Sequence, residues 1–393
     1  MYLRPRKRRG SSLIRVLVLV LLILGALYVV TERPEWLRNP FAPTPTPTRT
    51  AGSYLQEGEA LYWEGRLAEA VALLRLAIEL EPENDVPHAS LARLLALRGR
   101  TTEALEEARR AVELAPRKAE NKAILGMAMD WHASRVPDEE RGKLLKEALE
   151  ACQEAIRLNP DYAEAHAYLA EVYADLNSWE RSLEEARLAI ELDDGSVDAH
   201  RNLGYVLEKQ GKYSQAIREY ERAIELHPRL SYLYIGLGRN YLALGNYRRA
   251  IPQFEQAVEI EPDNPKTYDM LGWAYFSQGD YELAGTQFEK AIELDPDYSA
   301  AYGHLGLVYY VRRNYEEAIP FLKKAIEMGQ DMVEYYYELG LSYVFLEQCD
   351  QAIPWLEEAL EKDPAALPAY QGLVMCGERP PLPTPTPTLE GNP

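Results

Sequence analysis

Apolar residues recur along most of this chain with a spacing of 34 residues. In each 34-residue unit, positions 4, 7, 8 and 11 fall on one face of a first helix, and positions 20, 24 and 27 fall on one face of a second. The units that begin at residues 231 and 265 show this most clearly. Their residues at these positions are Tyr234, Leu237, Gly238, Tyr241, Ala250, Phe254 and Ala257, and Tyr268, Leu271, Gly272, Tyr275, Ala284, Phe288 and Ala291. The pattern predicts two packed helices in every unit.

Nine such units follow one another. Their predicted limits are 51–84, 85–118, 119–162, 163–196, 197–230, 231–264, 265–298, 299–332 and 333–366. Position 27 is Ala in all nine units, and position 8 is Gly in seven. Small residues there let the two helices approach closely, while large residues fill the space around them. Unit three has 44 residues, with the excess near 131–143. We interpret the excess as a loop or an extended helix end, and a binding role around Trp131 is the alternative.

These residues resemble the signature of the tetratricopeptide repeat family, over 316 of the 393 residues. The resemblance implies an all-α fold, a right-handed superhelical solenoid of about nine helix pairs. It also implies that the first helices line a concave groove. A short helix at 367–377 is predicted to cover the apolar end of the last unit. A Pro/Thr-rich tail at 378–393 is predicted to be disordered.

The first fifty residues follow a different pattern. Residues 1–12 are strongly basic, and an uncharged, mostly apolar run follows at 16–30. We predict a transmembrane signal anchor at 13–30, because Arg15 can reach the membrane interface. Basic residues stay in the cytoplasm, which places the repeats on the other side. A cleaved signal peptide is the alternative. The Pro/Thr-rich segment 31–50 is predicted to be an extended linker.

Charge and composition exclude several classes of function. The chain has 43 basic and 62 acidic residues, a net charge of −19, and nine of the basic residues precede residue 51. The acidic repeats would repel phosphate backbones, so we expect no nucleic-acid binding. Three cysteines exclude a disulfide-built scaffold, and we interpret Cys152 and Cys349 as small apolar residues. The sequence has no paired metal ligands, phosphate loop or hydrolase motif, so we expect no metal, no cofactor and no enzymatic activity.

The concave groove is the remaining candidate site. The resemblance places positions 2, 5, 9 and 12 of each unit in it, and in units five to nine these positions are rich in aromatic and apolar residues. The predicted partner-binding residues are Arg201, Tyr205, Tyr232, Ile235, Arg239, Trp273, Phe276, Leu307, Tyr310, Tyr337 and Leu341. Tyr, Trp and Arg dominate binding hot spots. The alternative is that these side chains pack on neighbouring helices.

The family's clamp for carboxylates is absent, because Ala167 and Glu171 stand where the clamp needs Lys and Asn. We therefore expect a membrane-tethered scaffold that binds a polypeptide segment of another exported or membrane protein. It would sit in the cell membrane as a single-pass protein, with the repeats outside the cytoplasm, and a homo-oligomer is possible. A self-associating spacer and a glycan-binding module are the alternative functions.

Overall fold

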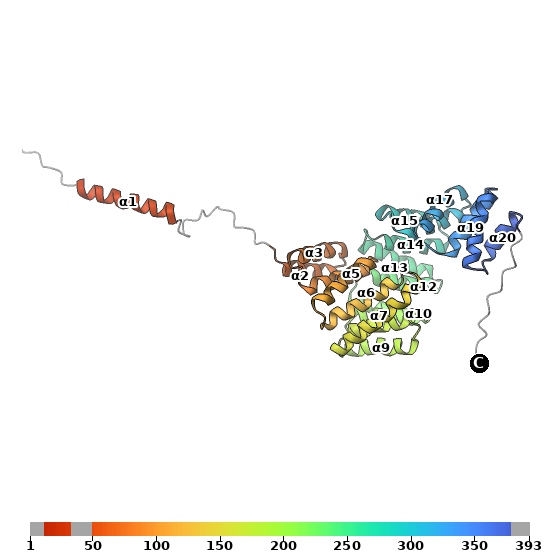
Figure 1. Cartoon of the computed structure of the whole chain (residues 1–393), viewed down its shortest axis with the longest axis horizontal. Coiled ribbons are helices and arrows are strands. Elements are labelled where there is room, and N and C mark those ends of the chain that lie inside the picture. Colours follow the sequence, from red (N-terminus) through yellow and green to blue (C-terminus); the bar gives the residue numbers. More distant parts are fainter. Residues whose placement is uncertain (1–11, 33–48, 379–393) are drawn as a thin grey trace, which may run out of the picture. The chain divides into compact units, whose positions relative to one another are not determined.

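The computed structural model describes residues 12–32 and 49–378 of the chain (Figure 1). The chain divides into two compact units, residues 1–49 and residues 50–393. Within the described residues the secondary structure is entirely helical. The all-α prediction is therefore confirmed.

The first unit contains helix α1 (Ser12–Glu32). In the described part of the chain, no helix combines the length and the apolar character needed to span a membrane. The structure thus does not support the predicted anchor at 13–30. The physical reason is length: the uncharged run of fifteen residues covers about 22 Å of a hydrocarbon core of about 30 Å. Most of the predicted linker at 31–50 and nearly all of the tail at 378–393 lie outside the described residues.

The second unit is a solenoid of helix pairs followed by one closing helix. The pairs are α2 (Ala51–Trp63) and α3 (Leu67–Leu80), α4 (Asp85–Leu97) and α5 (Thr101–Leu114), α6 (Ala119–Ala133) and α7 (Asp138–Leu158), α8 (Ala163–Asp175) and α9 (Trp179–Leu192), α10 (Val197–Lys209) and α11 (Tyr213–Leu226), α12 (Ser231–Ala243) and α13 (Tyr247–Ile260), α14 (Pro265–Gln278) and α15 (Tyr281–Leu294), α16 (Ser299–Val311) and α17 (Tyr315–Glu327), and α18 (Val333–Phe345) and α19 (Cys349–Lys362); the closing helix is α20 (Leu367–Met375). Each pair falls within one 34-residue unit or its longer variant.

Small residues bring the two helices of a pair together. In the pair α14–α15, a Cβ atom added at Gly272 would lie 2.7 Å from the ring of Phe288. Phe288 and Ala291 are fully buried beneath it. The ring thus occupies the space that a side chain at position 8 would fill, as the sequence pattern predicts.

The extra residues of unit three mainly lengthen its second helix. Helix α6 ends at Ala133, and α7 begins at Asp138 and runs for 21 residues. Pro137 precedes α7, and Asp138, Glu139 and Glu140 fill its first turn, where acidic side chains interact favourably with the helix dipole. A short turn, residues 134–137, is left between the two helices and faces the interior of the solenoid.

The solenoid returns on itself within its first six pairs (Figure 1). The end of α2 meets the turn between α11 and α12: the rings of Trp63 and His227 stack with centroids 4.0 Å apart. The Tyr62 and Tyr232 hydroxyls lie 3.1 Å apart. We call residues 50–266 the closed turn, and these contacts the closing contacts. One apolar core accordingly contains residues as distant in sequence as Leu61 and Leu233.

Two ion pairs belong to the closing contacts. Arg93 of α4 lies 2.8 Å from the Asp198 carboxylate of α10 and donates a hydrogen bond to the Tyr62 hydroxyl, also at 2.8 Å. Arg98 bonds to Asp263, after α13, at 2.9 Å. Because Arg93 and Asp198 are largely shielded from water, their attraction is screened less than that of an exposed pair.

Gly65 is the point of closest approach between the two ends of the closed turn. Its φ angle is +80°, in the region that favours glycine. A Cβ atom at this position would lie 2.0 Å from the backbone oxygen of Arg229. No rotation of a side chain could relieve that overlap, so the closing contacts require glycine here.

A disulfide joins Cys349 and Cys376. The interpretation of Cys349 as a small apolar residue was therefore wrong. Cys349 is the first residue of α19, and Cys376 directly follows α20, so the antiparallel return of α20 brings the two together. Cys152 is a buried free thiol in the α6–α7 core, as interpreted from the sequence.

Candidate functional site

The eleven predicted groove residues fall into two groups in the structure. Arg201, Tyr205, Tyr232, Ile235 and Arg239 line a cavity inside the closed turn. The other six, which are Trp273, Phe276, Leu307, Tyr310, Tyr337 and Leu341, lie on α14, α16 and α18 and do not contribute to that cavity. The closed turn separates the two groups, because it encloses the concave side of the first pairs and leaves the later pairs open.

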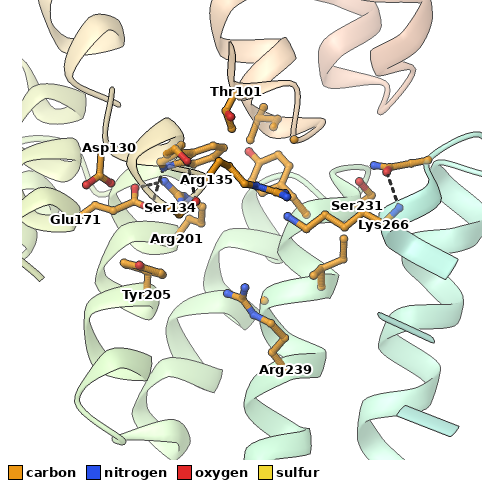
Figure 2. Close-up of a pocket in the computed structure, with 18 of the residues that line it drawn as sticks. Thr101, Asp130, Ser134, Arg135, Glu171, Arg201, Tyr205, Ser231, Arg239 and Lys266 are labelled. Atoms are coloured by element: carbon orange, nitrogen blue, oxygen red, sulfur yellow. Dashed lines mark hydrogen bonds and ion pairs between the residues drawn. The ribbon is translucent and has the colours of Figure 1, made fainter. Parts of the chain in front are cut away.

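The first group surrounds a cavity of about 220 Å³, which we call the central cavity. Figure 2 shows side chains entering it from several helices. Its polar wall residues are Thr101, Asp130, Trp131, Ser134, Arg135, Glu171, Asp175, Arg201, Tyr205, Tyr220, Ser231, Tyr232, Arg239, Asn264 and Lys266. The wall therefore combines residues of regular repeats with residues of the turn after α6.

Arg201 is held by neighbours within the wall. Its guanidinium bonds to the two carboxylate oxygens of Glu171 at 2.6 and 3.3 Å and lies 4.9 Å from the centre of the Trp131 ring. The Trp131 indole N–H also donates to Glu171, at 3.0 Å. The Arg201 Nε atom is buried without a hydrogen-bond partner, but the two-bond pair with Glu171 fixes the conformation of the wall. Arg201 thus holds the wall together, and its charge is already neutralised.

One end of the cavity wall is acidic. Asp130 is buried, and its Oδ1 atom has no hydrogen-bond partner in the structure. Burial raises the pKa of Asp130 well above its ordinary value, and the nearby Glu171 and Asp175 carboxylates raise it further. The raised pKa favours the neutral form of Asp130, which lowers the negative charge beside Glu171 and Asp175, and these two carboxylates are paired with Arg201 and Lys209.

The other end is cationic, and we call it the cation end. It consists of Arg135 from the turn after α6, Arg239 from α12 and Lys266 from the start of α14. In Figure 2 the side chains of Arg135 and Lys266 extend toward one another, with Arg239 reaching into the same space. Burial, together with the positive charges of Arg239 and Arg135, lowers the pKa of Lys266 to about 8. These cations act on one another across the cavity.

The second group of predicted residues includes both core and surface positions. Leu307 and Leu341 are each only 7% exposed and belong to the core. These two side chains, and that of buried Ile235, pack on neighbouring helices, which was the alternative interpretation of the groove residues. The remaining four, Trp273, Phe276, Tyr310 and Tyr337, are partly exposed, and we call them the aromatic row.

The aromatic row is packed against other rings, which limits its motion. The Trp273 and Phe276 rings stack with centroids 5.3 Å apart, and Trp273 also lies 4.7 Å from the His304 ring. Tyr310 meets the edge of Tyr315 at 5.8 Å. Rings already held in place lose little conformational freedom when a partner binds them.

Glu338 is an acidic residue beside this row. Burial, with a smaller effect of Glu334, raises the pKa of Glu338 to about 8. Its Oε2 atom is buried without a hydrogen-bond partner in the structure. The position therefore holds a protonated carboxyl group at neutral pH, close enough to Tyr310 and Tyr337 to raise the pKa of both hydroxyls.

Sequence reasoning missed the part played by Arg135. The aromatic residue in the insertion, Trp131, indicated a binding role as the less favoured alternative, and the structure places Trp131 in the cavity wall. Lys266 occupies position 2 of unit seven, which is one of the groove positions, but it is not among the predicted partner-binding residues. Arg135 has no equivalent in the regular repeats, so no comparison between units could identify it. In the part of the chain that the structure describes, His, Cys, Asp and Glu form no group suited to a metal ion.

Comparison with known proteins agrees with the observed helix pairs. Models of the tetratricopeptide repeat match residues 51–84, 86–110, 140–197, 196–263, 254–285, 270–333 and 333–365. A TPR repeat-containing thioredoxin of Arabidopsis thaliana, TTL4, is 29% identical over 125 residues. That match covers 32% of this chain and 12% of the relative, so the chain spans about an eighth of that protein.

Solved structures show the same fold at low identity. The crystal structure of the APC/C hetero-tetramer Cut9-Hcn1 is similar with a TM-score of 0.63 and 18% identity, over 84% of this chain and 65% of that one. The human IFIT1 dimer with m7Gppp-AAAA is similar with a TM-score of 0.54 and 18% identity, over 83% and 80%. Both likenesses establish the solenoid of helix pairs.

Proposed function

Because the chain belongs to the tetratricopeptide repeat family, we propose that it is an interaction scaffold that binds a polypeptide segment of another protein. The aromatic row carries the proposal. It places four partly exposed rings on three successive first helices, α14, α16 and α18. Aromatic side chains with one packed face and one free face are typical of binding hot spots.

The closed turn favours this location over the earlier repeats. An extended segment needs a continuous open surface, whereas the concave side of the closed turn is reduced to a cavity of about 220 Å³. The pairs from α14 onward lack such a closure. A segment could therefore lie across the aromatic row, with its apolar side chains between the rings.

A photo-crosslinking amino acid at position 310 tests the proposal in the source cell. The wild-type background should capture a small set of proteins, and Trp273→Lys should abolish capture because it places a charge within the row. Helix content, measured by circular dichroism, should not change. Trp179→Lys is the matched control, since Trp179 is 37% exposed at the start of a second helix, α9. Capture that survives Trp273→Lys would contradict the assignment, and capture of a second copy would indicate self-association.

We further propose that the partner is exported and that the repeats work outside the cytoplasm. The Cys349–Cys376 disulfide supports this location, because disulfides persist in oxidising compartments. Attachment to the cell membrane through residues 13–30 is part of the same proposal and is supported by the sequence pattern alone. Alkylation of whole cells with a membrane-impermeant thiol reagent, before and after reduction, checks the location. Labelling of these cysteines only after treatment with a membrane-impermeant reductant is expected, and no labelling after that treatment would contradict the location.

A further inference from the structure

The cation end of the central cavity is assembled from parts of the chain that are far apart in sequence. Arg135 comes from the turn created by the insertion of unit three, Arg239 from α12 and Lys266 from the start of α14. The closed turn brings Arg135 to the other two. The cluster therefore depends on two features special to this chain, the insertion and the closing contacts.

Two of the three cations have no counterion. Arg239 lies 3.2 Å from a Glu208 carboxylate oxygen. For the Arg135 guanidinium and the Lys266 ammonium group, the described residues offer no carboxylate within ion-pair distance. Lys266 is half-buried, whereas Arg135 is exposed and the Arg239 side chain is 39% exposed. The three positive charges repel one another across the cavity, and a bound anion reduces that repulsion.

The acidic residues closest to Lys266 are already engaged elsewhere. The Glu261 carboxylate accepts hydrogen bonds from Ser231 and Asn264. Asp269 lies 2.6 Å from the His304 imidazole and accepts a hydrogen bond from Tyr298. The second oxygen of Glu261, Oε1, has no hydrogen-bond partner, but neither carboxylate lies within ion-pair distance of Lys266. The Lys266 ammonium group is therefore available to an anionic ligand.

The size of the cavity limits that ligand. A volume of about 220 Å³ accommodates a single side chain or a chain end and excludes a folded domain. The Tyr232 ring and the Ile235 side chain provide apolar wall beside the cations. The arrangement suits a carboxylate on a short aliphatic stem, with charge-assisted hydrogen bonds from Arg135, Arg239 and Lys266.

We propose that the cation end binds a carboxylate group of the polypeptide segment, either an acidic side chain or a C-terminal carboxylate. This inference rests on the proposed function, since it assigns a chemical group to the segment. Its residues differ from those of the family's known clamp, and one of them, Arg135, lies outside any regular repeat position.

Calorimetric titration of the full chain with short blocked peptides tests the inference. Acetyl-Gly-Glu-Gly-amide presents a side-chain carboxylate, acetyl-Gly-Gly-Gly presents a C-terminal one, and acetyl-Gly-Gln-Gly-amide presents neither. We expect at least one carboxylate peptide to bind tenfold or more tightly than the Gln peptide. Equal binding of all three peptides would overturn the inference. Binding of free succinate without binding of either carboxylate peptide would also overturn it.

Variants connect the binding to the named cations. Arg135→Met and Lys266→Met should each weaken binding of the carboxylate peptide by tenfold or more, without lowering the melting temperature. Arg187→Met, on the exposed face of α9, is the charge-matched control and should bind normally. Unchanged binding by both cavity variants would overturn the inference.

The dependence on pH provides a second readout. Lys266 faces Arg135, Arg239, Glu261 and Asp269, and with a pKa of about 8 it loses its charge between pH 7 and pH 9. Binding should weaken several-fold over that interval in the wild type, whereas Lys266→Arg should bind with little change. A flat profile in the wild type would count against the role of Lys266.

The two proposals can fail independently. Trp273→Lys should abolish capture at position 310 and leave binding of the carboxylate peptide intact, because Trp273 does not line the cavity. Capture at position 310 without peptide binding would overturn this inference alone. Peptide binding without capture would instead overturn the assignment of the aromatic row as the binding surface.

Discussion

The pKa of a single polar side chain in this solenoid depends on where the repeats place it. Glu338 is the clearest case. It lies on α18, and burial raises its pKa to about 8. When the pKa of a carboxyl group is higher in the folded state than in the unfolded chain, the free energy of unfolding falls as the pH rises between the two pKa values.

Glu338→Gln should therefore remove a pH dependence. In the wild type, between pH 4.5 and pH 8, the folded protein keeps a proton that the unfolded chain loses, so its stability falls as pH rises through this interval. The free-energy change is on the order of 3 kcal/mol, reduced in practice by partial solvent access. Urea denaturation at pH 5 and pH 8 should show a smaller difference for the variant.

Glu357→Gln, which changes an exposed carboxyl group on α19, should leave that pH difference as it is in the wild type. An identical pH profile for Glu338→Gln and the wild type would show that Glu338 is ionised at neutral pH. The sequence could place Glu338 on the first helix of unit nine, but its pKa depends on the neighbouring unit and on Glu334, which periodicity does not describe.

At the scale of elements, the closing helix α20 depends on one covalent bond and a small apolar contact. Leu373 and Ala369 are buried, and a Cβ atom at Gly372 would lie 2.8 Å from the Leu356 side chain of α19. A helix of nine residues is marginal without such packing. The disulfide holds its far end to the start of α19.

Replacing both cysteines, as Cys349→Ala with Cys376→Ala, should loosen α20 selectively. The bond closes a loop of 27 residues, for which the chain-entropy relation gives about 3.5 kcal/mol of stabilisation. Amide hydrogen exchange should accelerate in residues 367–375 and stay slow in α12 and α13. Reduction of the wild type should give the same result, and unchanged protection of α20 in both would contradict it.

The elements themselves followed from the sequence almost completely. Tyr, Leu, Gly and Ala at fixed positions set the helix pairs, because each unit repeats the same local packing. A short helix was also predicted at 367–377, where the structure has α20. The disulfide was not, since the position of Cys349 matched tyrosines in other units and nothing in a repeat pattern describes where a last helix turns back.

At the scale of the whole molecule, the closing contacts change what the solenoid presents to a partner. They could not be predicted from the sequence, because periodic positions describe how each unit packs on the next and do not fix the curvature accumulated over six units. The repeat pattern does not distinguish Trp63, Arg93 and Arg98 from other residues. The predicted groove was consequently divided into a cavity and an open row.

Gly65→Ala should open the closed turn. The added Cβ atom collides with the backbone oxygen of Arg229, and the left-handed φ adds roughly 1 kcal/mol of strain. Small-angle X-ray scattering should show a larger radius of gyration, and the melting temperature should fall. Binding of the carboxylate peptide should weaken as well, because Arg135 moves away from Lys266.

Gly211→Ala is the control that distinguishes backbone strain from the steric collision with Arg229. Gly211 has a similar φ of +71° and no atom within 4 Å of an added Cβ. This variant should lose some stability but keep the wild-type radius of gyration. If both variants have equal dimensions, the contact between Gly65 and Arg229 does not hold the turn closed.

The closing contacts also bear on cooperativity. A repeat array ordinarily behaves as a linear chain in which each unit senses its neighbours alone, so its ends fray first. Here Tyr62 touches Tyr232, 170 positions later, and Arg98 touches Asp263, 165 positions later. The first unit thus becomes the neighbour of the sixth, and its terminal position no longer makes it the weakest. During synthesis, α2 must wait for residues 227–263 before it gains its full set of contacts. Once these form, we expect the first six units to unfold as one body, while the last three remain a conventional array.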